Sequence, residues 1–333
     1  MKKNEQPLLE VRGLKKHYDL AKGWFAKERK VLKAVDGVDF KVFSGETFGI
    51  VGESGCGKST TGNVILRLLE ATDGEILFEG QDLRLLTPEQ MREKRKDIQM
   101  IFQDPFSSLN PRLKVSEIIA EPLRSHNIMR GKQLQQQVLE LMETVGLSAS
   151  YANRYPHEFS GGQRQRIGIA RALALKPKLI VCDEAVSALD VSIQAQILNL
   201  LSRLQNEFKL TFIFIGHGLP AVKHISDRIA VMYMGKIVEM AGKEQLFSHP
   251  RHPYTKGLLS SIPIPDPSLQ SVKKTAILNG DIPNGVNPPK GCNFHTRCPY
   301  VSDKCKEIEP LLKETGKEGQ LAACHYPLAA NDE

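Results

Sequence analysis

Gly52-Glu53-Ser54-Gly55-Cys56-Gly57-Lys58-Ser59 is the stretch that decides the fold, because it has the form G-x-x-x-x-G-K-[ST]. It follows an apolar, strand-like run over residues 47–51 and precedes a helix-like run over residues 59–69. A strand, a glycine loop and a helix in this order form the context in which the pattern binds phosphates. The glycines let backbone N–H groups approach an anion, and the positive end of the helix adds to the attraction.

We therefore expect this loop to hold the β- and γ-phosphates of a nucleotide. Lys58 would place its ammonium group on these phosphates, and the hydroxyl of Ser59 would bind Mg²⁺. The alternative is a tight turn that happens to contain a lysine. The flanking strand and helix favour the phosphate-binding interpretation.

The composition is that of a soluble globular protein, with 333 residues, 41% hydrophobic and 25% charged. This length suits one large domain or two unequal ones. No apolar segment follows Lys2 and Lys3 as in a signal peptide, and apolar runs such as residues 210–215 are too short to cross a bilayer. We expect a cytosolic protein that needs a separate membrane partner if it works at a membrane.

The net charge is +7, and much of the excess lies before residue 34. Such an excess suits nucleic acid or anionic lipid. No interleaved aromatic pattern for base stacking is apparent, which favours a solvated, lysine-rich loop instead.

Strand-like and helix-like runs alternate along the chain, which predicts a mostly parallel sheet covered by helices. The expected strands include residues 98–102, 178–182, 211–215, 229–232 and 236–240, and the expected helices include 160–175 and 191–208. Residues 104–158 read as a helical insertion with helices over 115–123 and 133–145. Residues 262–290 are rich in Pro, Asn and Gly, and indicate a linker or an irregular lobe.

Polar residues follow several of these apolar strands. Gln103, the pair Asp183-Glu184, and His217 each come just after a strand. Ligands of parallel sheets bind beyond the carboxyl ends of the strands, so we expect these residues at the same edge as the glycine loop. Asp183 would bind Mg²⁺ opposite Ser59, and Glu184 would polarise the water that attacks the γ-phosphate.

Ser160-Gly161-Gly162-Gln163 is a second stretch with glycines and a hydroxyl at a helix start. This arrangement binds anions, although an ordinary capped helix has the same composition. A second phosphate-binding helix start in one chain suggests that it meets the nucleotide of another subunit.

With Phe159, this stretch is similar to the signature motif of ABC ATPases, and the order of glycine loop, Gln103, signature, Asp183-Glu184 and His217 also fits that family. The resemblance covers residues 8–260. It implies an α/β P-loop NTPase fold with a RecA-like core, an antiparallel β part and a helical subdomain at about 104–165. The expected division is an ATPase domain over 1–261 and a small, irregular, cysteine-rich extension over 262–333.

Several runs resemble the ATP-binding subunits of bacterial oligopeptide and dipeptide importers in particular. They are residues 103–111, residues 155–159 and His249-Pro250-Arg251-His252-Pro253-Tyr254. The chain is thus expected to be an ATPase that couples hydrolysis to peptide import. The alternatives are an importer for nickel or another small solute and, less favoured, a soluble ABC ATPase acting on nucleic acid.

The resemblance also assigns roles to individual residues. Tyr18 would stack on adenine, Gln103 would couple the Mg²⁺ site to the helical subdomain, and His217 would contact the γ-phosphate and the water. Asp190 would lie at a contact between two ATPase subunits. The residues implied for ATP are Tyr18, Gly52, Glu53, Ser54, Gly55, Cys56, Gly57, Lys58, Ser59, Thr60 and Gln103, and those for Mg²⁺ are Ser59, Gln103 and Asp183.

The implied partners are a second ATPase subunit, expected to be a paralogue, two membrane permeases and, indirectly, an extracytoplasmic solute-binding protein. Nucleic acid is not expected as a partner. Each signature stretch would face the glycine loop of the other ATPase, and the protein would lie at the cytoplasmic face of the membrane.

The sequence departs from the family pattern at three positions. Phe159 replaces the usual Leu, Ala185 stands where Pro is frequent, and Gly218 follows His217 where Asp is usual. Gly218 predicts a looser turn and a somewhat less active site. His217 is kept, so hydrolysis is still expected.

Four cysteines near the end, Cys292, Cys298, Cys305 and Cys324, have the spacing C-x5-C-x6-C-x18-C. Four thiols can hold zinc or an iron–sulfur cluster, and this spacing matches neither a zinc ribbon nor a simple ferredoxin run. The resemblance implies a [4Fe–4S] cluster. Zinc and unligated thiols are the alternatives.

Overall fold

The computed structural model describes residues 6–20, 30–104, 106–262, 283, 285–316 and 319–329. The chain divides into two compact units. Unit 1 comprises the described parts of residues 1–42, 48–84 and 217–333, and unit 2 comprises residues 43–47 and 85–216. Most of the lysine-rich loop and most of residues 262–290 lie outside the described residues.

An antiparallel sheet forms the first part of unit 1, with the strand order β2-β1-β4-β5. Its strands are β1 (Leu9–Asp19), β2 (Val31–Val42), β4 (Asp73–Phe78) and β5 (Gln81–Asp82). Leu9, Val11 and Leu14 of β1 are buried, and a shift in register separates Val11 from Leu14. Tyr18 lies within β1, one residue before its end.

The glycine loop belongs to the second part of unit 1. Strand β3 (Thr47–Val51) pairs in parallel with β9 (Arg228–Tyr233), which pairs antiparallel with β10 (Lys236–Gly242). Helix α1 (Lys58–Ile65) follows the loop. The remaining helices before the C-terminal segment are α7 (Leu219–Ile225), α8 (Lys243–Ser248) and α9 (Pro253–Ser260).

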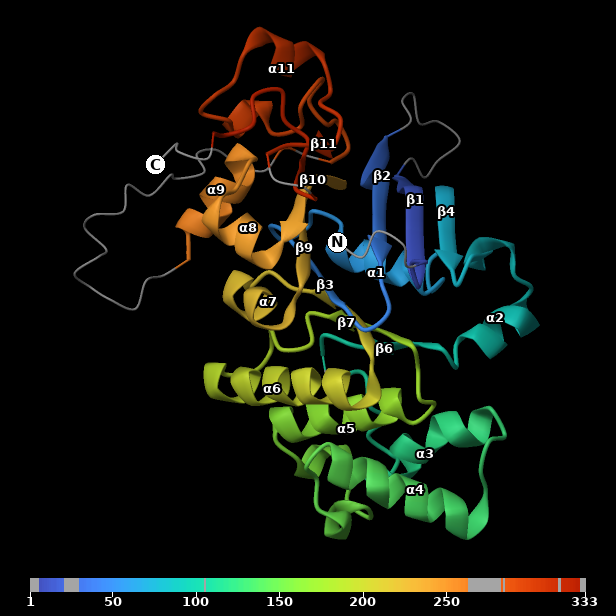
Figure 1. Cartoon of the computed structure of the whole chain (residues 1–333). Coiled ribbons are helices and arrows are strands. Elements are labelled where there is room, and N and C mark those ends of the chain that lie inside the picture. Colours follow the sequence, from blue (N-terminus) through green and yellow to red (C-terminus); the bar gives the residue numbers. More distant parts are fainter. Residues whose placement is uncertain are drawn as a thin grey trace, which may run out of the picture. The chain divides into compact units, whose positions relative to one another are not determined.

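The C-terminal segment also belongs to unit 1 (Figure 1). It contains η4 (His295–Arg297), α11 (Asp303–Glu307), β11 (Lys313–Glu314) and β12 (Leu321–Ala322). Strand β12 pairs with β10, and β11 pairs with β12. The cysteine-rich segment therefore extends the sheet that carries the glycine loop.

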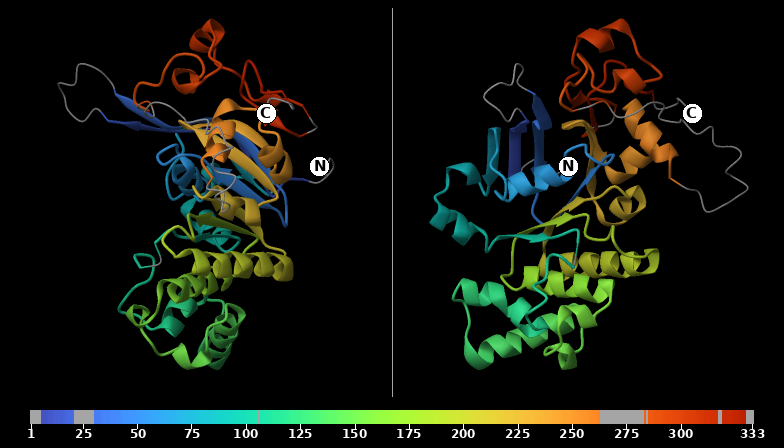
Figure 2. Two further views of the ribbon diagram at one scale, coloured as in Figure 1. Left: turned by 90° about the vertical axis from the view of Figure 1, so that its left-hand side faces the viewer. Right: turned by 180° about the vertical axis from the view of Figure 1, so that it is seen from behind.

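Unit 2 is built on three parallel strands, β6 (Ile98–Ile101), β7 (Leu179–Asp183) and β8 (Thr211–Ile215), with β7 in the middle. Every residue of β7 and β8 is buried, as expected for parallel strands covered on both faces. The helices are α2 (Pro88–Lys94), α3 (Val115–Ser125), α4 (Gly131–Thr144), α5 (Gly161–Leu173) and α6 (Val191–Phe208). Figure 2 shows α3, α4 and α5 packed on one another.

The fold class predicted from the sequence is confirmed, and several elements have the predicted ends. The helix after the glycine loop is shorter than predicted, because Arg67 has a left-handed backbone (φ 50°) and ends it early. In the described part of the chain, no helix combines the length and the apolar character needed to cross a membrane.

Candidate nucleotide-binding site

Two glycines of the loop are required by backbone geometry. Gly52 has φ 154°, and a Cβ atom there would lie 2.1 Å from the carbonyl oxygen of Met232. Gly57 has φ 105°, and its Cβ would lie 2.0 Å from the carbonyl oxygen of Ala34. A side chain at Gly52 would displace the backbone of β9, and one at Gly57 would displace that of β2. Both glycines are therefore needed for a close approach of main chains.

The side chain of Lys58 lies within the glycine loop and is hydrogen-bonded to it. Its side chain is buried, and its Nζ donates to the carbonyl oxygens of Gly52 (2.9 Å) and Glu53 (3.0 Å). Helix α1 begins at Lys58, and within the described residues no side chain caps it. A helix N-terminus without a side-chain cap and an adjacent ammonium group together attract a phosphate.

Glu53 is fixed by two residues that sequence reasoning did not place in the site. Its backbone N–H donates to the hydroxyl of Tyr254 (2.9 Å), and its carboxylate accepts two hydrogen bonds from Arg297. Tyr254 ends the run that resembles the peptide importers, and that run was the available signal. Arg297 adjoins Cys298, and its neighbours in the sequence carry no signal that pairs it with Glu53.

The two predicted carboxylates follow β7 in unit 2. Asp183 is buried at the end of the strand. Glu184 has a left-handed backbone (φ 47°), which is uncommon for a residue with a side chain. Its N–H donates to the carbonyl oxygen of Ile215 (2.9 Å), and its own carbonyl accepts from the N–H and hydroxyl of Ser187 (3.0 and 2.9 Å). These bonds hold the strained turn in place. Strained backbone conformations of this kind cluster at functional sites.

The structure brings Gln103 and Glu184 together. The Nε2 atom of Gln103 donates to Oε2 of Glu184 at 2.8 Å, across 81 residues of sequence. Both residues follow neighbouring parallel strands, β6 and β7. This contact agrees with the expectation that polar residues after these strands meet at one sheet edge.

The signature stretch begins helix α5 as a capping box. Gln163 N–H donates to Ser160 Oγ (3.4 Å), and Ser160 N–H donates to Gln163 Oε1 (3.0 Å). A Cβ atom on Gly162 would lie 2.4 Å from Cγ2 of Ile193 in α6. The capped helix weighed as an alternative is therefore present, and Gly162 also allows α5 and α6 to pack closely.

Asp190 and Tyr18 have more ordinary surroundings. Asp190 caps α6, where its Oδ1 accepts from the N–H of Ile193 (3.0 Å) and the hydroxyl of Ser192 (2.7 Å). These hydrogen bonds hold the pKa of Asp190 below its usual range. Tyr18 is half-buried on β1, with the ammonium of Lys16 5.0 Å from its ring centre.

His217 is exposed in unit 1, and Gly218 after it is the N-cap of α7. Gly218 has φ −81° and ψ 95°, and nothing lies within 4 Å of where its Cβ would stand. This backbone is open to residues other than glycine. The glycine therefore removes a possible side-chain cap from α7 but is not required by the shape of the turn.

The six cysteines are all free. Burial raises the pKa of Cys292 to about 11, and burial together with the thiol groups of Cys292, Cys298 and Cys305 raises the pKa of Cys324 to about 11. No three His, Cys, Asp or Glu side chains in the described ranges are grouped to hold a metal ion, so the prediction of iron–sulfur gains no support from the structure.

Comparisons with known proteins agree with this geometry. The family model described as ABC transporter matches residues 35–187, and the model for the oligopeptide/dipeptide transporter C-terminal region matches residues 238–305. The oligopeptide transport ATP-binding protein AppF of Bacillus subtilis (strain 168) is 53% identical, covering 97% of this chain and 98% of its own. OppF of Salmonella typhimurium (strain LT2) is 54% identical, covering 92% of each chain.

Among solved structures, a dimeric post-hydrolysis state of the ATP-binding cassette MJ0796, bound to ADP and Pi, resembles the fold. Its TM-score is 0.63 at 29% identity, covering 71% of this chain and 98% of that one. A glycine loop before an uncapped helix, with a carboxylate pair after a buried strand, defines the class of P-loop ATPases. The chain belongs to the ABC transporter family, in the group of oligopeptide and dipeptide transport ATP-binding proteins.

Proposed function

We propose that this chain is the ATP-hydrolysing subunit of an ABC importer for oligopeptides or dipeptides. The observation that carries the ATPase assignment is the loop geometry, in which close backbone contacts force glycine at positions 52 and 57 and leave Lys58 beside a helix start. The relatives named for oligopeptide transport, which match almost the whole chain, support peptides as the solute class.

The glycine loop, with Thr60 behind it, would bind the triphosphate, and Tyr18 would stack on adenine. Ser59, Gln103 and Asp183 would hold Mg²⁺, which neutralises charge on the β- and γ-phosphates. Glu184 would orient the attacking water, and His217 would contact the γ-phosphate. The bond from Gln103 to Glu184 supports a shared task for these two residues, because it fixes the orientation of the carboxylate.

Two such ATPases would enclose ATP between them. Ser160, Gly161, Gly162 and Gln163 would face the partner's nucleotide, and Asp190 would lie at the contact between the subunits. The dimeric state of the related cassette supports this arrangement. We further propose that the partner is a paralogue of this chain.

The assembly would sit at the cytoplasmic face of the membrane on two permease subunits, and a solute-binding protein outside would deliver the peptide. Hydrolysis would separate the two ATPases and change the access of the permeases. We propose that residues 1–261 form the ATPase domain, with a helical subdomain at about 104–165, and that residues 262–333 form the C-terminal extension.

Co-purification from membranes of the native organism tests this function. We expect two permeases and a second ATPase in the complex, together with peptide-stimulated ATP hydrolysis in the presence of the binding protein. Stimulation by nickel or another small solute instead of peptides would overturn the substrate class. Binding of DNA or RNA that weakens steeply with salt, without any permease, would overturn the importer itself.

We also propose that Cys292, Cys298, Cys305 and Cys324 hold a [4Fe–4S] cluster. The four cysteines within one short segment support this, because thiolates are the usual ligands of iron–sulfur clusters. The cluster would supply a structural crosslink for the C-terminal segment. An anaerobic preparation is expected to be brown, to absorb near ~400 nm and to contain about four iron atoms per chain. A colourless protein with one zinc per chain, or with four titratable thiols and no metal, contradicts the proposal.

A further inference from the structure

A half-buried, bidentate ion pair joins the cysteine-rich segment to the glycine loop. Arg297 Nη1 donates to Oε2 of Glu53 (2.8 Å), and Nη2 donates to Oε1 (3.0 Å). The side chain of Arg297 is only 4% exposed, and that of Glu53 is 23% exposed. Paired guanidinium–carboxylate bonds fix orientation as well as distance, and this one raises the pKa of Arg297, which stays charged.

Aromatic rings surround the ion pair and bind Glu53 a second time. The guanidinium carbon of Arg297 lies 5.8 Å from the ring centre of Tyr233 and 6.0 Å from that of Phe294. The ring centres of Tyr233 and Tyr254 are 4.6 Å apart, and the Tyr254 hydroxyl accepts the N–H of Glu53 at 2.9 Å. One packed group therefore holds both the side chain and the backbone of this loop residue.

The segment that carries Arg297 has its own anchors away from the loop. We name residues 291–316 and 319–329 the cysteine lobe. Buried Glu239 on β10 accepts the N–H groups of Arg251 and His252 (each 2.8 Å), and also a bond from Gln320 of the lobe (3.2 Å). The guanidinium Nη1 of Arg251 donates to the carbonyl oxygen of Leu328 (2.6 Å), and the N–H of Leu328 donates to the carbonyl oxygen of Arg251 (2.9 Å). The run His249–Tyr254 thus ties the lobe to β10 at one end and to Glu53 at the other.

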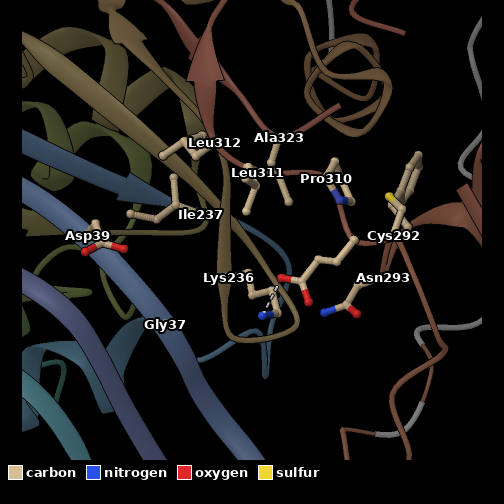
Figure 3. A pocket seen from close by; sticks show the side chains of 13 residues that line it. Gly37, Asp39, Lys236, Ile237, Cys292, Asn293, Pro310, Leu311, Leu312 and Ala323 are labelled. Atoms are coloured by element: carbon tan, nitrogen blue, oxygen red, sulfur yellow. Dashed lines mark ion pairs between the residues drawn. The ribbon is translucent and has the colours of Figure 1, made fainter. Parts of the chain in front are cut away.

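Another ion pair joins the lobe to β10 and does not involve the glycine loop. Lys236 Nζ lies 2.7 Å from Oε1 of Glu309, beside a cavity of about 150 Å³ that Cys292 and Asn293 also line (Figure 3). This pair holds the lobe in place but has no contact with Glu53. It therefore offers a matched control for the effect of lobe docking alone.

The state of Glu53 bears directly on the phosphate site. It is the second residue of the glycine loop, and its carbonyl oxygen accepts a hydrogen bond from Lys58 Nζ at 3.0 Å. Three partners thus act on one residue: Arg297 on the carboxylate, Tyr254 on the N–H and Lys58 on the carbonyl. A loop held in this way has less conformational freedom to lose when it binds a ligand.

We propose that Arg297 is a positioning residue for the nucleotide: by holding Glu53 it keeps the glycine loop in its phosphate-binding form, and it makes the affinity for MgATP depend on the cysteine lobe. The inference rests on the proposed ATPase function. Arg297 does not itself have to touch the nucleotide for this role.

Equilibrium binding of MgATP to the full-length chain, with steady-state hydrolysis by the complex, tests the role. We expect Arg297→Met to raise the Kd for MgATP roughly tenfold, within the 5–150-fold usual for coupled sites. KM for ATP should rise with Kd, while kcat at saturating MgATP changes less than threefold. Arg297→Lys should give a smaller rise, because a single ammonium replaces the two-pronged bond.

A double-mutant cycle separates this contact from a general loss of stability. Glu53→Gln and Arg297→Met should each weaken binding, and the double variant should bind no more weakly than the weaker single variant. Glu309→Gln should bind MgATP like the wild type. Thermal unfolding of each variant shows whether it is folded, and Arg297→Lys decides the matter if Arg297→Met does not fold.

Two results would overturn the inference: unchanged MgATP affinity in folded Arg297 variants, or an equal loss of affinity in Glu309→Gln. Additive losses in the cycle would also contradict it, because additivity means that the two residues do not act on each other. A wild-type chain that fails to bind MgATP would overturn the ATP site as well, so failure of the proposed function shows in the wild type and failure of this inference shows only in the variants.

Discussion

Replacing Glu184 by glutamine is expected to lower the rate of ATP hydrolysis by about 10²–10⁴-fold while MgATP still binds, because glutamine cannot act as a base toward the attacking water. The change is close to isosteric. The oxygen of the new amide can still accept from Gln103 Nε2, and the backbone bonds of residue 184 to Ile215 and Ser187 do not involve the side chain. The strained turn should therefore persist, and the loss should be one of chemistry.

Single-turnover hydrolysis and equilibrium binding, measured on the same preparations, separate these two steps. Glu207→Gln on the exposed end of α6 provides a matched control and should hydrolyse ATP at the wild-type rate. Hydrolysis by Glu184→Gln within tenfold of wild type would remove Glu184 from the catalytic role. A parallel loss of MgATP binding would mean that the turn after β7 has collapsed.

Removing the ammonium group of Lys58 is expected to be the other large effect. Lys58→Ala should weaken MgATP binding about 10–100-fold, because a charge-assisted hydrogen bond contributes about 1.5–3 kcal/mol. Hydrolysis should fall further, by about 10²–10³-fold at saturating MgATP, as for other preorganised donors at developing charge. The variant also leaves the carbonyl oxygens of Gly52 and Glu53 without the hydrogen bonds that Lys58 Nζ donates to them.

Binding titrations, ATPase rates and peptide uptake by the assembled importer measure these losses. Lys58→Arg should be nearly as impaired, since the Lys58 side chain is buried and a guanidinium is larger and flat. Lys306→Ala, which breaks an exposed ion pair with Asp303, should behave like the wild type. Uptake that survives Lys58→Ala would exclude this loop as the motor's phosphate site.

Elements with strong local patterns were predictable to the residue. Strand β8 (Thr211–Ile215) is an uninterrupted apolar run, and α6 (Val191–Phe208) shows a helical apolar period with a cap at Asp190, so both have the predicted ends. The short helices α7, α8 and α9 were not predicted, because six to eight residues are too few to show a period. The end of α1 was also missed, since a left-handed Arg67 gives no sign in the sequence.

The sequence alone identified the functional residues that lie close together along the chain. The positive φ values of Gly52, Gly57 and Glu184 are local backbone properties, and the motif that contains them can be read from neighbouring residues. The structure adds that Gly52 and Gly57 also lie against the distant main chain of Met232 and Ala34. Only the tertiary structure placed Arg297 on Glu53, 244 residues away, with Tyr254 on the same residue from 201 residues away. Such contacts arise from which buried surfaces pack together, and no local preference encodes the partner of a charge that far along the chain.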